Sequence, residues 1–166
     1  PLWRLARAGG ARALVVEAMR TFVSANRQWI RHVLPGIRVL THMGLKATTD
    51  AERIAVAHVF EIGVAGDPSD YCDKELNRLC DATLPRMGLA SEATEARVAV
   101  LRVMASAMGW GSKGKYNFLS NVRLDVACSA AAAMFARGGE GVCAAAFSAL
   151  VAACRWKAPP SPAMRV

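Results

Sequence analysis

The chain contains few residues whose types and spacing could support catalysis or metal binding. Its three histidines, His32, His42 and His58, are scattered, and no pair of acids and no nucleophile with a neighbouring base stands out. The five cysteines fall in apolar runs typical of helices and form no CxxC or Cys/His cluster. This pattern argues against a zinc site or a disulfide framework and favours a reducing compartment. We therefore expect no enzymatic activity, no metal and no cofactor.

Residues 111–115, Gly-Ser-Lys-Gly-Lys, are the nearest approach to a phosphate-binding loop. They lack the GxxxxGKS or GxxxxGKT spacing of such loops, and no predicted strand precedes them. Nucleotide binding is therefore not expected at this segment.

Most positions between Val122 and Ala153 are small or apolar, and the main interruption is at residues 137–141, Arg-Gly-Gly-Glu-Gly. A helix that is apolar nearly all round has to be buried, and a cluster of glycines breaks a helix. We therefore predict a central hairpin of two buried helices, Val122–Phe135 and Val142–Trp156, with the other helices packed around it.

The first forty residues combine one apolar stripe with an excess of arginine. Apolar side chains recur at the helical period from Arg12 to Trp29, which predicts an amphipathic helix that ends before Pro35. A polar connection over Thr41–Thr48 should follow. The first forty residues hold seven arginines and one acid, Glu17, and this composition is also typical of a mitochondrial presequence.

The start of the second helix is marked by Thr49-Asp50-Ala51-Glu52, which has the form of a capping box. In such a box the threonine hydroxyl accepts from the backbone N–H at Glu52, and the Glu52 carboxylate reaches back. The pattern predicts a helix that begins at Asp50 and ends at Asp67-Pro68, because the residue before proline is pushed out of the helical region.

Two further helices are expected before the hairpin. A short one should span Cys72–Leu84, after which Pro85 and Gly88 interrupt the chain. The next should span Glu95–Met108, with a core face of Val98, Leu101, Met104 and Met108. No segment alternates like a strand and no apolar run reaches about 18 residues, so the sequence predicts an all-α domain without a membrane-spanning helix.

Motifs at long spacing point to a family. Residues 62–67, Ile-Gly-Val-Ala-Gly-Asp, fit the LxxxGD core of a BH-three motif, and residues 109–111, Gly-Trp-Gly, resemble the Asn-Trp-Gly-Arg centre of a BH-one motif. Trp156 stands where the BH-two tryptophan would lie, and the stripe from Leu14 to Trp29 is similar to a BH-four helix. In order and separation these motifs resemble the Bcl-2 family of apoptosis regulators across residues 12–157.

The resemblance implies a single Bcl-2-like bundle of seven or eight helices over residues 1–157, followed by a flexible tail over residues 158–166. In this family an apolar groove receives an amphipathic BH-three helix. The implied function is an apoptosis inhibitor that sequesters the BH-three helices of pro-apoptotic proteins. The expected groove residues are Val59, Phe60, Val64, Leu101, Met104, Met108, Trp110, Gly111, Lys113, Tyr116 and Leu119.

The chain also departs from the family pattern. Ser112 replaces the BH-one arginine that pairs with the ligand's aspartate, so Lys113 is the expected substitute, and Pro68 directly follows the BH-three aspartate. Such erosion of the motifs, together with a composition rich in Ala, Arg, Gly and Val, favours a viral homologue of the parapoxvirus kind. Its expected locations are the host cytoplasm and the mitochondrial outer membrane, and association with that membrane would require a C-terminal anchor beyond Val166.

The net charge of +8 keeps a different class of function open. A basic all-helical protein that binds nucleic acid or assembles as a coat subunit would explain the charge. Against this alternative, the basic residues are spread along every predicted helix, and few aromatic side chains are available to stack on bases. A small helical subunit of a mitochondrial assembly would explain only the arginines near the start.

Overall fold

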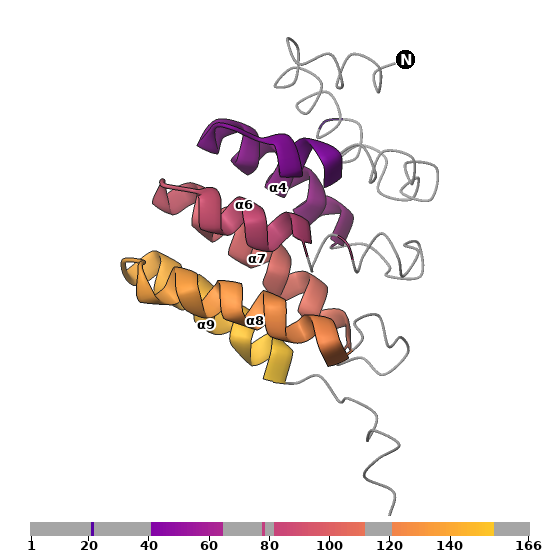
Figure 1. Ribbon diagram of the computed structural model, residues 1–166, viewed down its shortest axis with the longest axis vertical. Helices are drawn as coiled ribbons and strands as arrows, with labels where there is room; N and C mark the ends of the chain where they lie inside the picture. Colours follow the sequence, from indigo (N-terminus) through magenta and orange to yellow (C-terminus); the bar gives the residue numbers. More distant parts are fainter. Residues whose placement is uncertain (1–20, 22–40, 65–77, 79–81, 112–120, 155–166) are drawn as a thin grey trace, which may run out of the picture.

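The computed structural model describes residues 21, 41–64, 78, 82–111 and 121–154, which are mainly helical, with short described connections at 47–49, 91–93 and 137–139 (Figure 1). No strand occurs within these ranges, which confirms the predicted all-α class for the described residues. Six helical segments lie there, fewer than the seven or eight expected for the whole chain. Of the predicted helix Arg12–Trp29 only Thr21 is described, and it is helical, whereas the tail over 158–166 lies outside the described residues. The helical segments comprise residues 41–46, α4 (Asp50–Val64), α6 (Leu84–Ala90), α7 (Thr94–Gly111), α8 (Asn121–Ala136) and α9 (Glu140–Cys154).

Helix α4 begins at the residue that the capping box predicts. The Glu52 backbone N–H donates to the Thr49 hydroxyl oxygen at 3.2 Å, and the Thr49 N–H donates to the Glu52 carboxylate at 3.3 Å. The backbone N–H of Thr48 donates to the same carboxylate at 2.8 Å. These bonds satisfy N–H groups that the first turn of a helix leaves without partners, so the start of α4 is set locally.

Helix α7 is the centre of the described bundle, because it packs against α4, α6, α8 and α9. Figure 1 shows α4 on one side of α6 and α7, and the α8–α9 pair on the other. The prediction of a helix over Glu95–Met108 is confirmed, with Thr94 and Gly111 as its actual limits. Its inward side chains Leu101, Met104 and Met108 are at most 1% exposed, and they join the core formed with α4 and α8.

Helices α8 and α9 form the hairpin that the sequence predicts, but the hairpin is not covered on all sides. The exposed fraction is 45% for Phe135 and 62% for Phe147. The turn needs glycine at position 138, because a Cβ there would lie 2.5 Å from the Cβ of Val142 and 3.0 Å from the Met134 carbonyl oxygen. No helix among the described residues has both the length and the apolarity required to cross a membrane.

Two predicted connections are helical instead. Residues 41–46, expected as part of a polar connection, form a helix whose Thr41 and Met43 side chains are each 3% exposed. Pro85 and Gly88, expected to interrupt the chain, lie inside α6. Pro85 stands in the first turn, where its missing N–H would have had no helical partner, so it is compatible with a helix start.

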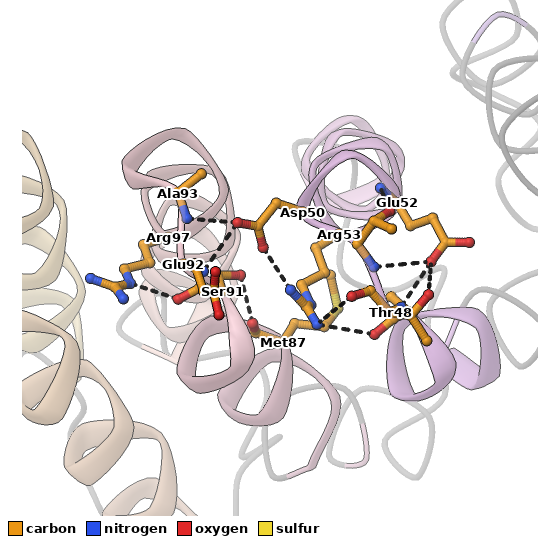
Figure 2. A network of polar contacts seen from close by, with 11 residues as sticks. Thr48, Asp50, Glu52, Arg53, Met87, Ser91, Glu92, Ala93 and Arg97 are labelled. Carbon is orange, nitrogen blue, oxygen red and sulfur yellow. Dashed lines mark hydrogen bonds and ion pairs between the residues drawn. The ribbon is translucent and has the colours of Figure 1, made fainter.

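A network of polar contacts ties α4 to the start of α7 (Figure 2). The Asp50 carboxylate accepts hydrogen bonds from the backbone N–H groups of Ala93 at 2.6 Å and Glu92 at 3.0 Å, and it pairs with the Arg53 guanidinium at 2.6 Å. Arg97 continues the network by donating to the Ser91 carbonyl at 2.9 Å. Asp50 therefore acts as a capping group for a helix far along the chain.

Candidate helix-binding groove

The residues predicted to line a groove between α4 and α7 are mostly core residues. Val59 and Phe60 on α4 are 2% and 1% exposed, and Leu101, Met104 and Met108 on α7 are equally inaccessible. In this structure none of these five side chains forms an open wall. Val64 ends α4, and Trp110 and Gly111 end α7, but only the helical backbone of these three residues is described. Lys113, Tyr116 and Leu119 lie outside the described residues.

A groove of about 530 Å³ lies on the neighbouring face of the same two helices. Its floor is α7, and α4 and α9 contribute the two sides. None of the predicted groove residues that the structure describes lines it, although Glu61 directly follows the predicted Phe60 and Arg102 directly follows the predicted Leu101. Successive residues on a helix are rotated by about 100°, so one step along the chain moves a side chain from the core to the groove. The lining residues are Glu61, Val98, Arg102, Ala105, Ser106, Gly141, Ala144, Ala145 and Ser148.

The α9 side of the groove is built only from small residues. Gly141, Ala144, Ala145 and Ser148 recur at spacings of three and four, which places them on one face of the helix. Ala144 and Ser148 are exposed, and the Ser148 hydroxyl donates to the Ala144 carbonyl at 3.0 Å. Small side chains allow the backbone of another helix to approach closely, as a bulky face would not.

The groove contains one acid and one base, and they do not pair with each other. Neither Glu61 nor Arg102 makes a hydrogen bond or ion pair in the part of the chain that the structure describes. Glu61 is partly buried and stands in the last turn of α4, and Arg102 is exposed at mid-length on α7. The groove therefore presents two opposite charges among small side chains, two of which are the serines Ser106 and Ser148.

The described helices have nearly balanced charge, although the chain is strongly basic. The ranges 41–64, 82–111 and 121–154 together with Arg78 carry eight basic and seven acidic side chains. Most of the excess positive charge therefore belongs to other parts of the chain. The bundle itself lacks the basic excess that would neutralise several phosphates of a nucleic acid.

Other chemistry is limited within the described ranges. No group of three or more His, Cys, Asp and Glu side chains there could hold a metal ion. Burial raises the pKa of the Cys128 thiol, and the nearby Cys154 and Asp125 act in the same direction, so Cys128 is a weak nucleophile. The Cys143 thiol donates to the carbonyl oxygens of Phe135 and Gly138 at 3.6 and 3.5 Å, which supports the end of α8.

Sequence reasoning found the helices that form the groove floor and one side, but it missed the side contributed by α9 and the two charges. One signal was available in the sequence. A carboxylate in the last turn of a helix opposes the helix macrodipole, and Glu61 stands near the predicted end of its helix.

Comparison of the chain with protein-family models, with curated proteins and with solved structures finds no match.

Proposed function

We propose that this protein binds a short amphipathic helix of another protein in the groove between α4 and α9. The observation that carries the proposal is the groove itself, an open volume of about 530 Å³ with a small-residue side and unpaired charges. A helix about 10 Å across rises about 5.4 Å per turn, so one turn occupies roughly 400 Å³. The groove thus has room for little more than one turn, and the rest of the ligand would lie along its open ends.

The partner class follows from the motifs that resemble the Bcl-2 family. The ligands are BH-three helices of pro-apoptotic proteins, and their sequestration in the host cytoplasm or at the mitochondrial outer membrane blocks apoptosis. A helical bundle that presents a groove to a helix is a recurrent mode of peptide recognition, in which apolar anchors set the affinity. The groove proposed for this role is the one lined by Glu61, Arg102 and Ala144, in place of the buried residues that the family pattern indicated.

The test is a titration of synthetic BH-three peptides against the whole chain and two matched variants. Ala144→Trp fills the groove from an exposed position on α9, and Ala132→Trp adds the same side chain to an exposed position on α8 outside it. A blocked groove should weaken binding about 5- to 150-fold, because a steric misfit costs about 1–3 kcal/mol and every 1.4 kcal/mol is a factor of ten. Ala132→Trp should bind like the parent chain and protect cells equally well against a death stimulus.

Two results would contradict the proposal. One is the absence of binding by every peptide in the panel, and the other is equal binding by both tryptophan variants. The salt dependence separates the alternative function, because phosphate contacts lose affinity steeply between roughly 50 and 200 mM salt. The groove offers one charge of each sign and no cluster of cations, so its affinity for a helix should fall far less over the same range.

A further inference from the structure

We infer that the groove recognises the charge pattern of its ligand, with Arg102 binding an acid and Glu61 binding a base on the same docked helix. This inference rests on the proposed function, because it concerns the same groove. It adds a class of ligand, which is an amphipathic helix with one acidic and one basic residue on the face that docks.

The placement of Glu61 is unfavourable for the free protein. Its carboxylate lies in the last turn of α4, near the backbone carbonyls that make this end of a helix negative, and the last turn contains no basic residue to compensate. The side chain is also partly buried and has no hydrogen-bond donor among the described residues. A ligand that brings a basic side chain to this position would supply the partner that the described part of the free protein does not provide.

Arg102 supplies the complementary half of the pattern. It lines the same groove from α7, and no acid of the described residues pairs with it, although Glu61 shares the cavity. A guanidinium offers several donors in a fixed plane that matches a carboxylate. The groove therefore favours a ligand that places an acid at Arg102 and a base at Glu61, and it disfavours a ligand with two charges of the same sign.

The spacing of the ligand's charges follows from helix packing. The axes of packed helices lie about 8–10 Å apart, and α4 contacts α7 directly. One turn of a ligand helix rises about 5.4 Å, so one to two turns cover the separation between α4, which carries Glu61, and α7, which carries Arg102. The acid and the base are therefore expected four or seven residues apart on one face of the ligand.

The experiment uses amphipathic helical peptides with one fixed aspartate. A lysine is placed three, four or seven residues away on either side, or is replaced by glutamine. Binding is measured to the parent chain, Glu61→Gln and Arg102→Gln. The controls are Glu95→Gln in the first turn of α7 and Arg86→Gln on α6, which make the same chemical changes at exposed positions outside the groove.

Glu61→Gln should lower the affinity for the best aspartate–lysine peptide by about two- to fivefold, and leave the affinity for the glutamine peptide unchanged. Arg102→Gln should weaken both peptides by a similar factor, because both contain the aspartate. Glu61→Gln should also raise the Tm of the free protein by roughly 1–4 °C, since it removes a charge that opposes the dipole. Glu95→Gln should leave binding unchanged and should not raise the Tm.

The outcomes separate this inference from the proposed function. If Ala144→Trp abolishes binding while the Glu61 and Arg102 variants bind all peptides like the parent chain, the groove is correct and the charge recognition is wrong. If Ala144→Trp binds every peptide normally, the groove is not the binding site and both proposals fall. Equal loss of affinity in the Arg86 and Glu95 controls would show a general charge effect and would also overturn the inference.

Discussion

Replacing Asp50 should test whether one side chain joins the first and central parts of the bundle. Its carboxylate accepts from the N–H groups of Ala93 and Glu92, at the start of α7, and pairs with Arg53 (Figure 2). The Arg53 side chain is 10% exposed and that of Asp50 is 20% exposed, so solvent replaces these contacts poorly. Asp50→Ala removes all three interactions in a single step.

The size of the effect can be worked from these contacts. Loss of a helix cap costs about 0.5–2 kcal/mol, and a hydrogen bond to a charged group contributes about 1.5–3 kcal/mol. Arg53 retains bonds to the carbonyls of Ala47 and Thr48 at 3.3 and 3.2 Å, which limits the penalty for its unpaired charge. We therefore expect Asp50→Ala to lower the free energy of unfolding by about 3 kcal/mol. Asp50→Asn keeps an acceptor for Ala93 and should lower it by about 1–1.5 kcal/mol.

The dependence on pH has a defined sign. Desolvation opposes ionisation of Asp50, but the Ala93 N–H, the Arg53 side chain and the Glu92 N–H outweigh it, so its pKa lies below the ordinary value of 3.8. A group whose pKa is lower in the folded state stabilises the fold above its unfolded pKa, and loses that contribution as the pH falls through the folded pKa. The difference in stability between the parent chain and Asp50→Asn should thus be constant near pH 7 and shrink below about pH 4.

The assay is urea denaturation followed by circular dichroism, at pH 7, 5 and 3. Glu95→Ala is the control, because Glu95 is an exposed acid in the first turn of α7 and lies outside the network. Its effect should be below about 1 kcal/mol. Equal stability of Asp50→Ala and Glu95→Ala at pH 7 would refute the reasoning, and so would a gap between the parent chain and Asp50→Asn that persists unchanged at pH 3.

Three further changes test the fold. Gly138→Ala should destabilise the hairpin by about 1–3 kcal/mol, because its Cβ would meet Val142 and a backbone carbonyl, whereas Gly139→Ala has open space and should match the parent chain in thermal melts. Met104→Lys should unfold the protein, since a charge at a site that is 1% exposed has no water or partner, and a native circular dichroism spectrum at 25 °C would contradict the core assignment. Thr49→Ala removes the hydroxyl that accepts from the α4 backbone, and should lower the free energy of unfolding by about 0.5–2 kcal/mol in urea denaturation.

The sequence by itself determined the features that depend on neighbours along the chain. The start of α4 at Asp50 follows from the hydroxyl of Thr49 and the carboxylate of Glu52, which act within one helical turn. The break between α8 and α9 follows from the glycines of residues 137–141, and the absence of strand patterns predicted the helical class. Pro85 was misjudged because a proline interrupts a helix interior but is tolerated in the first turn.

Only the tertiary structure decided which side chains are buried and which line a groove. The apolar period predicts one buried face of α7. Leu101 lies in the core, whereas its neighbour Arg102 lines the groove. Which face of α7 borders the groove depends on where α4 and α9 pack against it. The small residues of α9 lie nearly all round the helix, so the sequence pattern does not predict which face of α9 lines the groove. The contact between Asp50 and Ala93 joins residues 43 positions apart, and no local rule connects them because their meeting requires α4 and α7 to be packed.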